Sequence, residues 1–125
     1  MEEIKAGGIM LGNWFIGYNG KPFQWDAECF YLTQGVVSTN ELINKPIPIT
    51  EDILLNAGFR KHKMSGYDAH FIYSLFIGGE TIGITAIYNA DFSIMLHGVA
   101  RGVKHLHRLQ NIIKIVTGNE LEINL

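Results

Sequence analysis

The segment from Val103 to Gly118 constrains the fold most, because it predicts a long amphipathic helix. Its apolar residues recur three or four positions apart and so share one helix face: Val103, Leu106, Leu109, Ile112, Ile113 and Val116. Gly118 follows where a left-handed C-terminal cap is expected, and Lys114 lies in the last turn, where the helix dipole favours a cation. A helix with one apolar face needs a layer to cover it, so we expect the fold to be built against residues 103–117.

Two strands joined by a tight turn are predicted near the N-terminus. Asn19-Gly20 separates the apolar runs 9–16 and 21–25. Both turn residues tolerate positive φ, which a two-residue hairpin requires. We therefore expect an N-terminal β-hairpin.

Two short helices are predicted from their N-cap residues. Asp26 precedes residues 27–32, and Thr50 precedes residues 51–57. Both side chains can accept a hydrogen bond from the first helical turn. Pro46–Ile49 is expected to be extended, because a proline disfavours the helical region for the residue before it.

The stretch after the second helix predicts antiparallel strands. Alternation over 67–77, 81–88 and 92–97, with Gly78-Gly79 at the first turn, indicates three of them. Residues 60–66 and 98–102 carry no such pattern and are interpreted as connections, and 121–125 can form a last strand. The predicted fold class is α+β. It has an N-terminal hairpin, two short helices, a three-stranded antiparallel meander packed on one long C-terminal helix, and a final edge strand, within a single domain 1–125.

Composition and charge narrow the function classes. The chain of 125 residues is 47% hydrophobic and 18% charged, which excludes a disordered profile. Its net charge of -2 gives no global basic field, so nucleic acid is not favoured as a partner. Cys29 is the only cysteine and is interpreted as a small buried residue of an intracellular protein. The acidic N-terminus is no secretory signal and no apolar run is long enough to span a bilayer, so we expect no membrane contact and a cytoplasmic location.

Basic residues gather around the start of the predicted long helix. They are Arg101, Lys104, His107 and Arg108. Helix N-termini bind anions, so this end is a candidate site for a small anionic ligand. No Walker or dinucleotide pattern accompanies it, and the glycines of 98–102 also suit a tight connection without a ligand. The two interpretations stay open.

The histidines do not have the spacing of a metal site. His105 and His107 are two residues apart and would point away from each other on a helix. They could converge, together with His97, only if the helix began after His107. We expect no metal and no cofactor.

Aromatic residues crowd the predicted hairpin. Trp14, Phe15 and Trp25 are candidates for an interaction surface, and the alternative is that they pack the hairpin onto its own domain. No pair of acidic residues is placed as general acid and base, and the order of the chain supports no Ser-His-Asp set. The chain is therefore predicted not to be an enzyme.

Three segments resemble a known family. They are Leu11–Trp14, Pro46–Phe59 and His107–Leu121. They are similar to short uncharacterised proteins of Bacteroides-type bacteria, their phages and mobile elements, which show the patterns LxxGN, PIPLTEExLLxxGF and VHQLQN…LTGxEL. The departures are mild: Ile49 for leucine, Asp52 for glutamate, Leu106 for valine and Arg108 for glutamine. The resemblance implies a phage or mobile-element context in a bacterial host, but it carries no activity.

The resemblance also marks His107, Gln110 and Asn111 as matching polar residues of the family's helix. They either line a binding site or satisfy backbone groups of neighbouring strands. The function predicted is a non-catalytic interaction module that acts through a protein partner or self-association, as a homo-oligomer. The alternative is a phage accessory protein that binds a small ligand or nucleotide and sequesters a signal.

Overall fold

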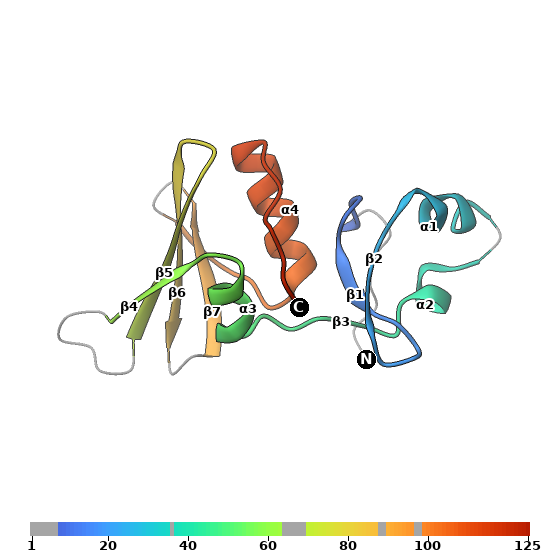
Figure 1. Ribbon diagram of the computed structural model, residues 1–125, viewed down its shortest axis with the longest axis horizontal. Helices are drawn as coiled ribbons and strands as arrows, with labels where there is room; N and C mark the ends of the chain where they lie inside the picture. Colours follow the sequence, from blue (N-terminus) through green and yellow to red (C-terminus); the bar gives the residue numbers. More distant parts are fainter. Residues whose placement is uncertain (1–7, 36, 64–69, 88–89, 97–98) are drawn as a thin grey trace. The chain divides into compact units, whose positions relative to one another are not determined.

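The computed structural model describes residues 8–35, 37–63, 70–87, 90–96 and 99–125. The chain forms two compact units (Figure 1). Unit 1 comprises residues 1–48 and 105–111, and unit 2 comprises residues 49–104 and 112–125. Both contain strands and helices, so the predicted α+β class is confirmed.

Unit 1 contains a three-stranded antiparallel sheet in the order β2-β1-β3. Its strands are β1 (Trp14–Ile16), β2 (Pro22–Gln24) and β3 (Lys45–Pro46). The predicted hairpin is confirmed: Gly20 has a φ of 78°, and its N–H donates to the Gly17 carbonyl at 3.0 Å. β3 was not predicted as a strand, because two residues are too few to show a pattern.

Two short helices of unit 1 follow the hairpin. In α1 (Ala27–Leu32) the Asp26 carboxylate accepts a hydrogen bond from the Cys29 N–H at 3.0 Å, which confirms the predicted cap. The helix α2 (Thr39–Leu42) was not predicted. Ser38 at its N-cap makes no side-chain capping bond, so the local signal for this helix is weak.

The core of unit 1 is aromatic and aliphatic. It consists of Ile9, Phe15, Trp25 and Ile43, with Phe23, Cys29, Phe30 and Leu42 packed against them. The Trp25 ring meets Phe15 and Phe30 edge-on, with centroids 6.1 and 5.8 Å apart. The hairpin and α1 thus share one hydrophobic cluster.

Unit 2 contains the helix α3 (Glu51–Asn56) and a five-stranded antiparallel sheet. The strands, in spatial order, are β4 (Arg60–Lys63), β5 (His70–Ile77), β6 (Glu80–Ile87), β7 (Ala90–Leu96) and β8 (Val99–Gly102). The meander therefore has five strands, and the prediction of three was wrong. β4 is uniformly polar and β8 has only four residues, so neither shows the alternation that identifies a strand.

The long helix α4 (Leu106–Thr117) contributes residues 106–111 to unit 1 and residues 112–117 to unit 2. It begins later than predicted, because the preceding residues make extended pairings instead. The Val103 N–H donates to the Phe92 carbonyl at 2.9 Å, and the Leu106 N–H donates to the Ile47 carbonyl at 2.8 Å. The predicted final strand at 121–125 does not form, although Leu121 is buried.

The two faces of the large sheet differ. Tyr73, Ile84 and Ile94 are fully buried on one face, which α3 adjoins through the bond between Tyr73 and Glu51. The strand registers place a second set of residues on the opposite side, here called the outer face: Ile72, Ser74, Phe76, Thr81, Gly83, Thr85, Ser93 and Met95. None of these is buried.

The turn between β5 and β6 yields a first prediction. Gly78 and Gly79 both have positive φ, 59° and 79°. A Cβ on Gly78 would collide with the Asn119 amide and lie 3.1 Å from the Thr117 carbonyl oxygen, whereas a Cβ on Gly79 would meet nothing within 4 Å. Gly79→Ala should cost about 1–2 kcal/mol of unfolding free energy, from the left-handed backbone alone.

Gly78→Ala should cost about 1–3 kcal/mol more than Gly79→Ala, because the collision adds to the backbone strain. Urea unfolding followed by far-UV circular dichroism measures both values. Equal losses for the two variants would contradict this packing of the turn.

Candidate functional site

The Gln110 side chain bonds to the backbone of the N-terminal segment. Its Oε1 accepts from the Trp14 N–H at 3.0 Å, and its Nε2 donates to the Gly12 carbonyl at 3.0 Å. The Gln110 amide thus supplies one donor and one acceptor to this backbone, as a paired strand would. Gln110 is therefore occupied by the fold.

Asn111 makes a second pair of bonds in unit 1. Its Nδ2 donates to the Gly8 carbonyl at 2.7 Å, and its Oδ1 accepts from the Asn13 Nδ2 at 2.8 Å. Asn13 is 2% exposed, and its Oδ1 accepts from the Met10 N–H at 2.8 Å. Asn13, which matches the LxxGN pattern, therefore bonds to Asn111, which matches the LQN pattern.

His107 lies in the apolar interior of unit 1. It is 6% exposed, its ring centroid lies 4.8 Å from that of Phe15, and its Nδ1 is buried without a hydrogen-bond partner. Burial, with smaller contributions from the charges of His105 and Arg108, lowers the pKa of His107 to about 4. His107 is therefore neutral at pH 7.

The remaining predicted ligand residues are solvent-facing cations. Arg101 and Lys104 are exposed in unit 2, and Arg108 is exposed in unit 1. Of the six predicted residues, the structure engages Gln110 and Asn111 in the fold of unit 1 and buries His107. It does not gather the six into one site within either unit.

The predicted aromatic surface was wrong for two of its three residues. Phe15 is 0% and Trp25 is 1% exposed, because both belong to the hydrophobic cluster of unit 1. Trp14 is half-buried. Phe15 and Trp25 therefore pack the hairpin onto its own unit, as the alternative interpretation predicted.

The prediction that the His105 and His107 rings diverge was also wrong. The rings stack with centroids 6.1 Å apart and an interplanar angle of 11°, because His105 precedes the helix and is not part of it. Among the residues that the structure describes, no three His, Cys, Asp or Glu side chains are grouped as metal ligands. His97 lies outside the described residues.

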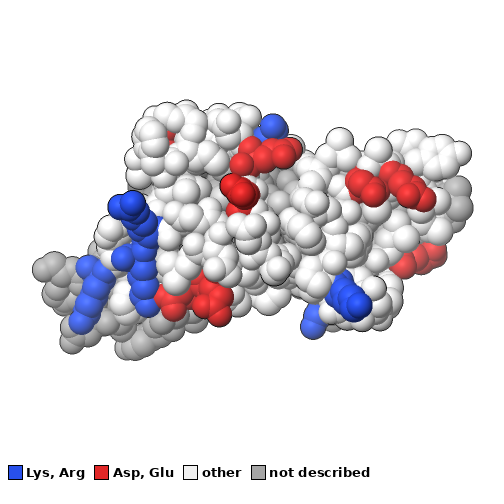
Figure 2. Space-filling model, in the orientation of Figure 1, with Lys and Arg blue, Asp and Glu red and all other residues white. Residues whose placement is uncertain are grey.

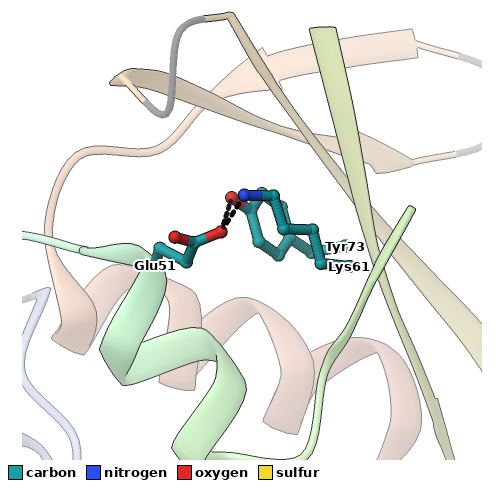
Figure 3. A network of polar contacts seen from close by, with 3 residues as sticks. All are labelled: Glu51, Lys61 and Tyr73. Atoms are coloured by element: carbon teal, nitrogen blue, oxygen red, sulfur yellow. Dashed lines mark hydrogen bonds and ion pairs between the residues drawn. The ribbon is translucent and has the colours of Figure 1, made fainter. Parts of the chain in front are cut away.

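A polar network in unit 2 was missed by the sequence analysis. The Glu51 carboxylate forms an ion pair with Lys61 and accepts a hydrogen bond from the Tyr73 hydroxyl at 2.9 Å (Figure 3). The bond from Lys61, followed by that from Tyr73, lowers the pKa of Glu51. Burial, followed by the nearby Glu51, raises the pKa of Tyr73. The network attaches α3 to β4 and β5, and the alternation that includes Tyr73 was its only sequence signal.

The outer face of unit 2 is the other candidate. Phe76 is 74% and Met95 is 39% exposed there, with half-buried Ile72 on the same face. Gly83 lies between them in the register, and a Cβ added to it would meet no atom within 4 Å. The face thus combines small and hydroxyl residues with the apolar side chains of Ile72, Phe76 and Met95.

Comparisons of the chain with protein-family models, with curated proteins and with solved structures give no match. The family resemblance therefore stays a prediction. Within the described ranges, no helix is long and apolar enough to cross a membrane.

The bonds of Gln110 yield a second prediction. Gln110→Ala removes the partner of the Trp14 N–H and leaves the Gly12 carbonyl with the 3.4 Å bond from the Gln24 Nε2, which should cost about 1–3 kcal/mol. Arg108→Ala, an exposed position on the same helix, should change the unfolding free energy by no more than about 0.5 kcal/mol. Urea unfolding followed by tryptophan fluorescence reports on unit 1, which contains both tryptophans. An equal effect of the two variants would show that Gln110 is not structural.

The buried His107 yields a third prediction. Its folded pKa lies below the unfolded value of 6.5, so the unfolded chain binds a proton that the folded chain rejects between pH 6.5 and about 4. The unfolding free energy should therefore fall by about 1.5 kcal/mol between pH 6.5 and pH 5. His107→Phe should remove most of this loss, and His105→Gln should keep it. An unchanged pH dependence in His107→Phe would refute the assignment.

Proposed function

We propose that this chain is a non-catalytic interaction module of phage or mobile-element origin that self-associates through the outer face of its five-stranded sheet. The observation that carries the proposal is the exposure of Phe76 and Met95 on a sheet face where none of the eight named residues is buried. Exposed apolar side chains on a regular surface are typical of protein contacts.

The charge of the outer face favours a second copy as the occupant. The eight residues that β5, β6 and β7 contribute to it include no Asp, Glu, Lys or Arg, and the cation Arg60 borders them on β4. Two copies can pack these eight residues against each other without opposing like charges. The small residues Ser74, Gly83 and Ser93 leave room for the projecting side chains of the second copy.

The size of the face indicates a weak dimer. The three strands β5, β6 and β7 carry its eight residues. With a spacing of about 4.8 Å and a rise of about 3.4 Å per residue, they give a face of roughly 400 Å². Stable protein interfaces bury about 800 Å² per partner. We therefore expect an association that depends on concentration in the micromolar to millimolar range.

The proposed origin has a separate basis. It rests on the three sequence segments that resemble phage and mobile-element proteins. Gln110 and Asn111 belong to one of these segments, and they bond to Trp14 and Asn13 of another. The resemblance therefore supports a shared fold more than a shared ligand.

The fourth prediction tests the outer face. Sedimentation velocity from about 10 µM to 1 mM should show a monomer–dimer equilibrium. Phe76→Ser should weaken it by about 10- to 100-fold, because about 1.5–3 kcal/mol of phenylalanine burial is lost. Tyr31→Ser, at a 73% exposed position of unit 1, should leave the dimer unchanged.

A chain that stays monomeric throughout this range would overturn the proposal. So would a Phe76→Ser variant that dimerises like the unaltered chain, because the contact would then lie elsewhere.

A further inference from the structure

The edge strand β4 concentrates positive charge. Its four residues are Arg60, Lys61, His62 and Lys63, and all are exposed. Lys and Arg side chains gather over this part of unit 2 at the left of Figure 2. The whole chain carries a net charge of -2, so this strand departs sharply from the average.

The basic side chains alternate between the two faces of the sheet. In the register, Arg60 and His62 lie opposite Ser74 and Ile72 on the outer-face side. Lys61 and Lys63 lie opposite residues of the other face. Residues on the same side of a strand are about 6.8 Å apart, which is also the spacing of side chains on any strand paired beside it.

One carboxylate is already bound at this strand. Lys61 forms an ion pair with Glu51, and its Nζ lies 4.1 Å from the centre of the Phe71 ring. The Glu51 carboxylate extends from α3 to β4 on the side of the sheet opposite the outer face. On the other side of the strand Arg60 is exposed, and the His62 ring bonds to the Ser74 hydroxyl at 3.1 Å.

We propose that the edge of β4 binds an acidic, extended segment of a partner protein by strand addition. Within the described residues β4 pairs with β5 alone and forms one edge of the sheet. An added strand gains backbone hydrogen bonds, and acidic side chains at alternate positions meet the basic side chains directly opposite. This partner differs from the one proposed for the outer face, and either proposal can fail without the other.

The charge of β4 also selects against two other partners. Basic side chains on an edge strand prevent two copies from pairing edge to edge, so a second copy is excluded from this edge. A nucleic acid offers phosphates but no peptide groups to continue the sheet.

The experiment uses the full chain and a fluorescently labelled eight-residue peptide of alternating Glu and Val, followed by anisotropy. Two further peptides carry N-methyl groups at every second amide, so that each has one blocked edge. The unmodified peptide should bind, with affinity that falls as salt rises. One methylated peptide should bind at least ten-fold more weakly than the other, because only one edge faces β4.

Variants of the chain locate the site. Arg60→Glu should weaken peptide binding about ten-fold or more, since it places a like charge opposite the acidic residues. Lys104→Glu changes an exposed cation outside β4 by the same charge and should have little effect. Circular dichroism establishes that both variants keep the fold.

Three results would overturn the proposal. The first is a peptide with Lys in place of Glu that binds as well as the acidic one. The second is equal binding of the two N-methylated peptides, which would indicate charge attraction without strand addition. The third is binding of a single-stranded oligonucleotide of equal charge with the same affinity and the same loss in Arg60→Glu.

Discussion

Backbone N–H and C=O groups need hydrogen-bond partners, and in unit 1 two side-chain amides of α4 supply several of them. The segment around Gly12 runs beside α4, and its other edge bonds to Trp25, whose carbonyl accepts from the Gly12 N–H at 2.8 Å. Gln110 and Asn111 supply the missing donors and acceptors, and Asn13 extends the chain of bonds to the Met10 N–H. This arrangement explains why polar residues stand within an otherwise apolar helix pattern. It also places His107 against Phe15, where its ring packs as part of the interior.

Unit 2 is organised by the difference between the two faces of its sheet. One face buries Tyr73, Ile84 and Ile94, and the network of Glu51, Lys61 and Tyr73 attaches α3 at its edge. The outer face has the opposite character, with small neutral residues and projecting Phe76. The proposed self-association uses this neutral face, and the proposed acidic partner uses the basic edge. One proposed contact is therefore apolar, and the other depends on charge.

Much of the fold could be predicted from local signals. Asn19-Gly20, Asp26, Thr50 and Gly78-Gly79 act through their own backbone and side-chain chemistry, and the structure has the turn or helix that each predicted. Elements that depend on distant partners could not be predicted. β4 has no alternation because it is exposed on both sides, and its strand state comes from pairing with β5. The same holds for the candidate sites, since only the fold shows that Gln110 bonds to Gly12 and that Phe76 is exposed on the outer face.

The central claim is that the outer face of the large sheet is the contact surface of the module. Two-dimensional ¹H–¹⁵N spectra recorded along a dilution series from about 1 mM to 20 µM test it directly. The account predicts progressive shifts concentrated at Ser74, Phe76, Thr85 and Met95, with the amides of unit 1 left in place. Spectra that do not change on dilution, or shifts concentrated in α1 and the N-terminal hairpin, would contradict it.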